Sequence, residues 1–484
     1  MKSLFRGAFL RGVSASVLSA SLAACTANPQ ALDRPGDVPQ AFTAPMNKSA
    51  PVWPQAGWWA KFGASELSPL QETAQKENLD IAQAAARVLQ AEANDGIALS
   101  ALFPTLGGTF SASRAGSNTP TLSGGRAHNA FSAGLSASYQ QGFFGTEYLR
   151  LQASREDLRA SRYAAAVVGI STASQVASEY FTILAFRERI AIAQANIAAS
   201  KRILAITQAK VSSGVQSNLD LAEQQALVAQ QESAMPGLIQ NEKQARYSLA
   251  ILLGRAPEGF DIKAQNLDGI DAPSLQPGLP SELLLRNPSI AQAEAQLYAA
   301  HANVDAARTL YFPSLSLNGG AGYGPVSSLS SLFGPAGFVW NIGAEVLQTV
   351  FDGGRIHAQN DQAKALQTEL IANYRKTVFT AFSDVEVSLD TVKSETDQLA
   401  LVEIQTKAQA EAFRISELQY REGTIDILSL LQNQQGLFVA QQLLVQTKLA
   451  RLQAHLALYN ALGGGWEQKA DDAGYKNQLD WWPL

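Results

Sequence analysis

The sequence predicts a mixed α and β membrane protein, built as a tandem structural repeat of long helices and strand hairpins. Three observations support this prediction. Landmark residues recur at a fixed interval, the apolar period changes from helical to strand spacing after each Phe-Pro pair, and two helical stretches, 147–211 and 355–421, run without a break.

The repeat is visible in pairs of landmarks. Three pairs lie 209 residues apart: Pro104 and Pro313, Gly214 and Gly423, and Gly254 and Gly463. Phe144 and Phe351 lie 207 residues apart, so the segments between the Phe-Pro pairs and these residues differ by two residues. We predict a first repeat over 61–254, an inter-repeat connection over 255–280 and a second repeat over 281–466.

The N-terminal segment, 1–24, has the features of an export signal. Lys2, Arg6 and Arg11 precede a weakly apolar run, 13–24, that ends in small residues. We therefore predict a lipoprotein signal peptide over 1–24.

Cys25 is the predicted lipidation site and the only cysteine of the chain. The run LAAC, 22–25, resembles the lipobox of bacterial lipoproteins, in which the cysteine becomes the lipidated first residue. The alternatives for an unpaired cysteine in an exported protein are a reactive thiol and an intermolecular disulfide. Thr26 follows, where such lipoproteins often carry an aspartate that signals inner-membrane retention, so an outer-membrane anchor is expected.

Residues 25–60 are rich in Pro, Ala, Gln and Asn and predict a lipidated N-terminal tether. A helix is expected over 66–102, and the Phe-Pro pair at 103–104 ends it. Apolar residues then alternate with small polar residues over 105–112 and 131–139, which predicts a strand hairpin. The second repeat shows the same change of period from Leu315 and over 338–347.

These strands fit a membrane better than a soluble half-buried sheet, which is the alternative. Each spans about 9 to 11 residues, the length of a tilted transmembrane strand. Their polar faces are mostly Ser, Gly, Thr and Asn, which a water-filled lumen tolerates. No apolar run approaches the ~18 residues of a spanning helix.

Unbroken helical patterns follow each hairpin, over 147–211 and 355–421, and shorter return helices come after Gly214 and Gly423. We expect the glycines to turn the chain at the ends of long antiparallel helices that pack as coiled coils. The glutamines of the return helices suit either close helix contacts or an ordinary solvated face.

Four strands cannot close a barrel, and an open sheet edge is unfavourable in hydrocarbon. Membrane-spanning strands would therefore require several copies of the chain. Two copies give eight strands, which leave no conduit, and three give twelve, the smallest number that leaves a pore.

Several segments resemble the TolC-type outer-membrane factors, in particular the lipoprotein NodT/OprM branch. They are the stretch from Trp58 to Ala93, the paired Phe-Pro hairpins, VFDGGR at 350–355 and ALYNALGGGW at 457–466. The resemblance implies a homotrimeric twelve-stranded outer-membrane β-barrel, continued by an α-helical tunnel through the periplasm. It also implies a periplasmic adaptor and an inner-membrane pump, of the RND type, as partners.

The resemblance places the glycine turns at the periplasmic tip and predicts that side chains near them constrict the tunnel. Relatives commonly carry a ring of leucines and a ring of aspartates there. Leu428 matches the leucine, whereas Ser429 and Gln432 stand where acids are frequent, so a less anionic aperture is expected. The other candidates are Asp220, Asp426 and Tyr420. Asp220 has the alternative of a helix N-terminal acid, and Tyr420 either forms an inter-helix hydrogen bond or only packs.

No catalytic or metal site is expected. The histidines, His128, His301, His357 and His455, lack a second ligand at metal-binding spacing, and there is no Walker or HExxH motif. Removing the signal leaves 34 basic and 42 acidic residues, a charge of −8, so nucleic-acid binding is not expected.

The sequence therefore predicts a passive exit duct for small molecules, with no cofactor beyond the lipid on Cys25. The alternatives are the outer-membrane conduit of a type I protein secretion system and a structural periplasmic lipoprotein without a pore. The tail, 467–484, carries Trp481 and Trp482 and has no assigned role.

Overall fold

A computed structural model describes residues 42, 52–116, 127–142, 144–273, 275, 278 and 280–466. The signal peptide, Cys25, most of the tether and the tail lie outside the described residues. Within them the chain forms two compact units, and each draws on both repeats. The first contains 91–158 and 296–372, and the second contains 52–90, 159–295 and 373–466.

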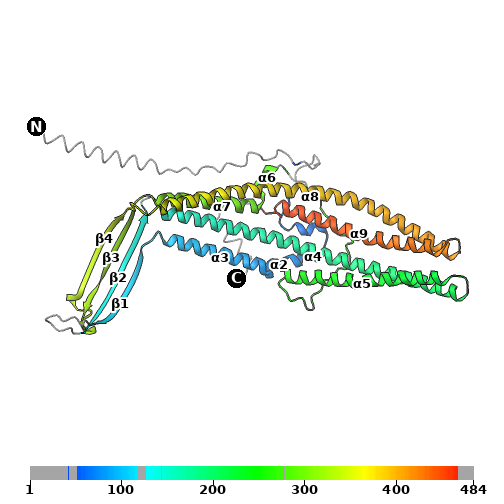
Figure 1. The fold of residues 1–484 in the computed structure, drawn as a ribbon, viewed down its shortest axis with the longest axis horizontal. Helices are drawn as coiled ribbons and strands as arrows, with labels where there is room; N and C mark the ends of the chain where they lie inside the picture. Colours follow the sequence, from blue (N-terminus) through cyan, green and yellow to red (C-terminus); the bar gives the residue numbers. More distant parts are fainter. Residues whose placement is uncertain are drawn as a thin grey trace. The chain divides into compact units, whose positions relative to one another are not determined.

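A single antiparallel sheet, in the order β1-β2-β3-β4, dominates the first unit (Figure 1). Its strands are β1 (Thr105–Ala115), β2 (His128–Gly142), β3 (Ser314–Val326) and β4 (Phe338–Leu347), with two short 3-10 helices, η2 (Leu329–Ser331) and η3 (Pro335–Gly337), before β4. β2 pairs with β3, so the hairpins of the two repeats form one sheet. β2 and β3 have 15 and 13 residues, longer than the 9 to 11 predicted.

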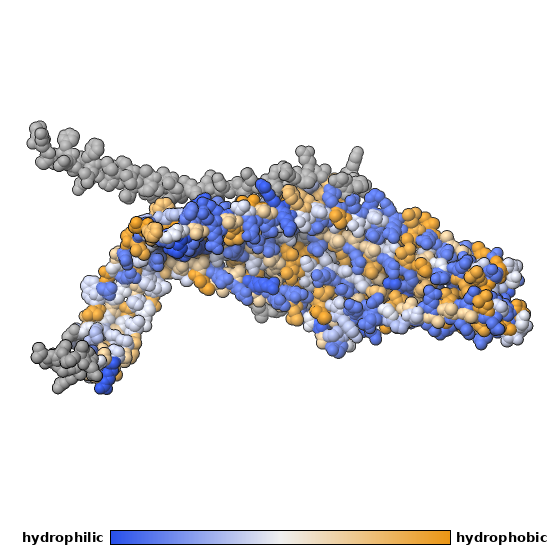
Figure 2. All heavy atoms as spheres, viewed as in Figure 1, coloured by the Kyte–Doolittle hydropathy of each residue, from blue (hydrophilic) through white to orange (hydrophobic). Residues whose placement is uncertain are grey.

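The predicted alternation of side chains is present in the sheet. The register aligns Leu106, Ala137, Gly319 and Ile342 in one cross-strand row. Every residue of β1 and of β4 is exposed, including Trp340 and Ile342. On the face shown in Figure 2 the strands carry mostly pale and orange residues rather than strongly hydrophilic ones. No helix in the described part of the chain is long and apolar enough to cross a membrane.

The helices follow the repeat. The short 3-10 helix η1 (Trp58–Phe62) spans the predicted boundary between the tether and the first repeat. The first repeat then contains α2 (Leu67–Glu77), α3 (Leu79–Ser100), α4 (Thr146–Ser212) and α5 (Asn218–Leu252). The second contains α6 (Pro280–Arg286), α7 (Pro288–Thr309), α8 (Arg355–Arg421) and α9 (Ile427–Ala461). α4 and α8 each have 67 residues, and α5 and α9 each have 35.

The single helix predicted over 66–102 is wrong, because the chain breaks at Asn78. This residue has extended backbone angles, φ −66° and ψ 129°. Its Oδ1 accepts hydrogen bonds from the amides of Asp80 and Ile81, both at 2.9 Å, and so caps α3. Its Nδ2 donates to the Leu252 carbonyl at 2.8 Å, at the end of α5. The break thus ties the start of α3 to the end of α5.

We call this hydrogen-bonded break, together with the end of the return helix, a joint. The second repeat has the same joint at Asn287, the position equivalent to Asn78. Asn287 Oδ1 accepts from the Ser289 amide at 2.9 Å, and its Nδ2 donates to the Ala461 carbonyl at 3.4 Å. In each joint a left-handed glycine follows the return helix and lies against the chain at the break. Gly254 (φ 67°) abuts the Glu77 carbonyl, and Gly463 (φ 86°) abuts the Arg286 carbonyl.

The main core of the second unit forms around the N-terminal segment. Trp58 and Phe62 are each 1% exposed, and Trp58 stacks on Tyr459 of α9 with ring centroids 4.6 Å apart. Phe62 meets Phe181 of α4 at 5.5 Å. Residues at the boundary between the predicted tether and the first repeat therefore pack against α4 and α9.

His455 of α9 gives the second unit a pH dependence. Burial and the neighbouring Arg451 lower its pKa to about 4, against the opposing effect of Asp271. Below pH 6.5 the unfolded chain binds a proton that the folded chain excludes until about pH 4, so stability falls as the pH falls through this window.

We expect the free energy of unfolding to be about 2 kcal/mol lower at pH 5 than at pH 7.5 through this residue alone. Urea unfolding of the wild type and of His455→Leu at both pH values measures it. The slope between the two pH values should be smaller in the variant, and an equal slope would exclude His455 as the source.

Candidate functional site

Both glycine turns have a left-handed backbone. Gly214 (φ 72°) follows α4 and Gly423 (φ 74°) follows α8. A Cβ at either position would meet nothing within 4 Å, so the left-handed backbone alone explains the glycine. The Val215 amide donates to the Lys210 carbonyl and the Thr424 amide to the Gln419 carbonyl, each at 2.9 Å, which closes both helix ends in the same way.

Asp220 and Asp426 both act at helix starts. Ser217 and Asp220 form a reciprocal capping box at α5, with both hydrogen bonds at 3.2 Å. Asp426 caps α9 by accepting from the Ser429 amide at 2.8 Å. Hydrogen bonds from the Ser429 hydroxyl and then from its amide lower the pKa of Asp426. Ser429 is therefore engaged with a carboxylate at the start of the helix.

Leu428 and Gln432 lie on one face of α9, because they are four positions apart. Leu428 is 50% exposed and Gln432 is exposed, whereas Ile427, Leu430 and Leu431 are buried. The structure thus presents Leu428 and Gln432 together on the accessible side of α9. That they line an aperture stays a prediction.

Tyr420 forms hydrogen bonds to other segments, the first of the two expected alternatives, and its ring is also packed in a core cluster. It is 3% exposed and packs with the cluster Ile203, Leu227, Ile427, Leu430 and Leu431. Its Oη donates to Gln216 Oε1 at 2.8 Å and lies 3.2 Å from Thr207 Oγ1. The Lys210 ammonium lies 4.2 Å from the ring centroid. Tyr420 therefore links α8 to α4 and to the turn before α5.

The helix pairs α4–α5 and α8–α9 each form a helix hairpin around a glycine turn. Tyr420→Phe should loosen the contact between these two helix hairpins while leaving the packing of the ring intact. Removing the hydroxyl leaves the half-buried Gln216 amide without its partner, a loss of about 1 kcal/mol. Planar-bilayer recordings should then show more frequent or larger openings than in the wild type. Tyr247→Phe is the control, because Tyr247 lies on α5 with 43% exposure. Identical recordings for wild type and Tyr420→Phe would count against a role in closure.

Tyr420 contacts three residues that were not predicted from the sequence: Thr207, Lys210 and Gln216. Each is polar and close to the first glycine turn, but nothing local distinguishes it from its neighbours. Their contacts with Tyr420 cross more than 200 positions of the chain.

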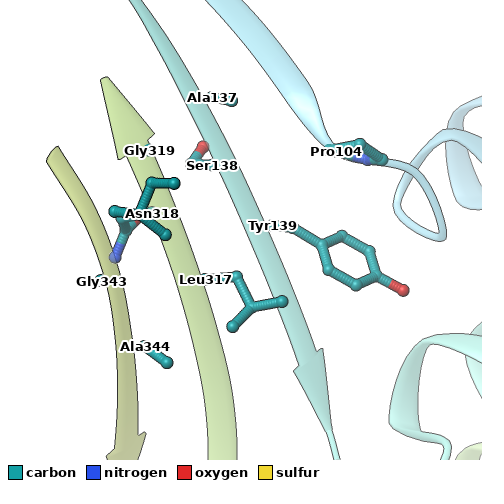
Figure 3. Close-up of a pocket in the computed structure, with 10 residues that line it drawn as sticks. Pro104, Ala137, Ser138, Tyr139, Leu317, Asn318, Gly319, Gly343 and Ala344 are labelled. Atoms are coloured by element: carbon teal, nitrogen blue, oxygen red, sulfur yellow. The ribbon is translucent and has the colours of Figure 1, made fainter. Parts of the chain in front are cut away.

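A hollow of 490 Å³ lies on the sheet of the first unit, whereas the glycine turns belong to the second unit. Figure 3 shows Tyr139 and Leu317 beside it, with Pro104, Ala137 and Gly319 among its other lining residues. The Tyr139 hydroxyl donates to Gln141 Oε1 at 2.6 Å. The hollow has no pair of titratable groups for acid-base chemistry. Among the described residues no cluster of His, Cys, Asp or Glu could hold a metal ion.

Comparison with known proteins explains the repeat and the sheet together. The model of the outer membrane efflux protein family matches the chain twice, over residues 70–255 and 279–464. The chain belongs to this family.

Other outer membrane efflux proteins match over most of their length. The pyoverdine export outer membrane protein OpmQ of Pseudomonas aeruginosa is 38% identical over 417 residues, which cover 85% of this chain and 87% of the relative. The cation efflux system protein CusC of Escherichia coli is 30% identical over 435 residues, covering 89% and 94%.

Solved channels share the fold. The CmeC outer membrane channel of Campylobacter jejuni superimposes with a TM-score of 0.84 at 25% identity, covering 90% of this chain and 94% of that one. The MtrE outer membrane channel of Neisseria gonorrhoeae, in its open state, gives 0.81 at 27% identity and covers 92% and 100%. The predicted family, tandem-repeat fold, efflux role and outer-membrane location are confirmed.

Proposed function

We propose that three copies of this outer membrane efflux protein form a passive exit duct for small molecules. The observation that supports it is the four-stranded sheet with β1 and β4 at its edges. An even number of antiparallel strands lets β4 of one copy pair with β1 of the next in the antiparallel sense. Three copies then give twelve strands, without an edge exposed to lipid.

Energy for export comes from partners, namely a periplasmic adaptor and an inner-membrane pump of the RND type. Neither the sequence motifs nor the described side chains form a site that would bind or hydrolyse a nucleotide as an energy source. The curated relatives are named for pyoverdine export, cation efflux and toluene efflux. The transported substrates are accordingly small molecules and ions, and the inner-membrane pump selects among them.

The lipid on Cys25 anchors each copy to the outer membrane. LAAC at 22–25 and the tether that follows support this part of the proposal. Metabolic labelling with palmitate should mark the wild type and not Cys25→Ser. Label retained by the variant would place the lipid on another residue, and absence of label from the wild type would reject lipidation.

Trimer recovery tests the duct directly. Outer-membrane fractions extracted with mild detergent should contain a heat-modifiable species of three chains, both in the wild type and in Cys25→Ser. A monomer that washes off once the lipid is lost would support the structural lipoprotein instead. Restoration of small-molecule resistance in a channel-deleted strain, without restored protein secretion, separates efflux from the type I conduit.

Gln432→Asp tests the proposed aperture. A carboxylate at this exposed position of α9 attracts cations electrostatically, so cation selectivity in planar bilayers should rise and should weaken at high salt. Gln398→Asp is the matched control, since Gln398 is also exposed but lies on α8, 25 positions before Gly423. Equal selectivity in the wild type and Gln432→Asp would remove this residue from the pore lining.

A further inference from the structure

Ser200 of α4 is the centre of a buried polar cluster that the aperture residues do not include. Three glutamine side chains surround it: Gln224 and Gln231 from α5, and Gln434 from α9. Ser200 and Gln224 are 0% exposed, Gln434 is 1% and Gln231 is 3% exposed. We call these four residues the Ser200 cluster. All four lie in the second unit, so both helix hairpins contribute to one site.

Each glutamine makes one hydrogen bond to Ser200. The Ser200 hydroxyl donates to Gln231 Oε1 at 2.6 Å and accepts from Gln434 Nε2 at 2.8 Å. Gln224 Nε2 donates to the Ser200 carbonyl at 2.8 Å. The hydroxyl proton and the orientations of the Gln231 and Gln434 amides are thereby fixed relative to one another, and the Ser200 carbonyl fixes the orientation of the Gln224 amide.

The other half of each amide has no partner within the described part of the chain. Gln224 Oε1, Gln434 Oε1 and Gln231 Nε2 are all buried and unbonded. If the oxygen and nitrogen exchange places in both the Gln231 and Gln434 amides, the two hydrogen bonds to the Ser200 hydroxyl reverse direction. One acceptor and one donor of these two amides are still left unpaired. The site therefore presents two unpaired acceptors and one unpaired donor in either arrangement, and buried groups of this kind normally have a partner.

The unpaired atoms of Gln231 and Gln434 belong to amides that bind the same hydroxyl. The oxygen and nitrogen of one amide are only about 2.3 Å apart, given its bond lengths. The unpaired atoms of Gln231 and Gln434 therefore lie within about 5 Å of Ser200 Oγ, since each is one amide width beyond a bonded atom. By the same reasoning the unpaired oxygen of Gln224 lies within about 5 Å of the Ser200 carbonyl oxygen.

We propose that the Ser200 cluster binds one internal water molecule. The water accepts a hydrogen bond from Gln231 Nε2 and donates to Gln224 Oε1 and Gln434 Oε1. Three bonds are typical of a buried water, and water supplies two donors and an acceptor at once. A metal cation does not fit, because the amide N–H of Gln231 faces the site and no carboxylate belongs to the cluster.

This water joins α5 to α9, beside the direct hydrogen bonds that both helices make to Ser200 of α4. Along α4, Arg189 bonds to Gln442 at 2.7 Å and Asn196 to Gln441 at 2.8 Å. A water-mediated contact can exchange its partners without stranding a buried amide. If the chain acts as the proposed duct, which this step assumes, the water supplies partners to the glutamine amides when the two hairpins move relative to each other.

A density map of the detergent-purified protein, sharp enough to resolve ordered waters, tests the site without reference to transport. A solvent peak within hydrogen-bonding distance of the three unpaired atoms is expected in the wild type. It should disappear in Gln231→Met, which keeps the side-chain length, and persist in Gln230→Met, whose parent residue is exposed. An empty site beside other resolved internal waters, or a peak retained in Gln231→Met, would overturn the proposal.

Bilayer recordings of the same two variants test the consequence. Gln231→Met should change the open fraction severalfold, whereas Gln230→Met should match the wild type. A site that loses its water with unchanged recordings would reject the role in hairpin movement, while the water site itself would stand. Absence of any channel activity in the wild type would instead contradict the proposed function.

Discussion

Gly254→Ala should be among the most destabilising single substitutions in the chain. Two effects add, because the residue has φ 67° and an added Cβ would run into the backbone carbonyl of Glu77. The left-handed backbone alone costs about 1–2 kcal/mol for a residue with a side chain. The collision adds to this, since backbone held by the Asn78 joint cannot shift as a flexible side chain could.

Gly259→Ala separates the two effects. Gly259 has nearly the same backbone, φ 75°, but nothing lies within 4 Å of its added Cβ. Thermal or urea unfolding of purified protein should show a small loss for Gly259→Ala and a clearly larger one for Gly254→Ala. Gly463→Ala should resemble Gly254→Ala, because it meets the Arg286 carbonyl in the same way. Equal losses at 254 and 259 would mean that the close approach contributes nothing.

Trp58→Ala should lower the free energy of unfolding by about 3–5 kcal/mol, the usual range for truncating a fully buried aromatic residue. Its ring is 1% exposed and contacts Tyr459 and Phe62 at centroid distances of 4.6 and 5.8 Å. Loss of the ring opens a cavity between the N-terminal segment and α9. Limited proteolysis should then cut this segment more readily than in the wild type.

Trp59→Ala is the matched control, because the neighbouring ring is only half-buried at the edge of the same core. Its effect should be distinctly smaller in the same unfolding experiment. If both substitutions lowered stability equally, Trp58 would not be the anchor of the segment.

Periodicity alone predicted most of the helices. α8 begins at Arg355 and ends at Arg421, as expected from the sequence, because a long apolar repeat ends at a glycine that must take a left-handed backbone. The break at Asn78 was missed, since no proline or glycine interrupts the pattern there. Its cause is a hydrogen bond to Leu252, 174 positions away. The second repeat does carry a signal, because Pro288 stands at the first position of α7.

The candidate site was predicted less completely. The turns at Gly214 and Gly423 follow from local backbone chemistry, and a hydrogen bond from Tyr420 was one of two expected outcomes. Which residues bond to the Tyr420 hydroxyl depends on the packing of helices from different repeats. A local sequence pattern cannot specify that packing. The glutamines illustrate the same limit, because Gln224 and Gln231 are buried while Gln225 and Gln230 are exposed.

The pairing of β2 with β3 has a consequence for biogenesis. The strands come from different repeats, so the sheet requires contacts between segments roughly 180 positions apart. Contacts of such high sequence separation form slowly, because the entropy of closing the intervening chain must be overcome first. Until the second repeat has been secreted, the first exposes an unpaired strand edge with apolar side chains, which is prone to aggregation. The helices form from local contacts and therefore early, whereas the sheet has to wait for the second repeat. Newly exported chains should therefore depend on periplasmic chaperones until the sheet has formed.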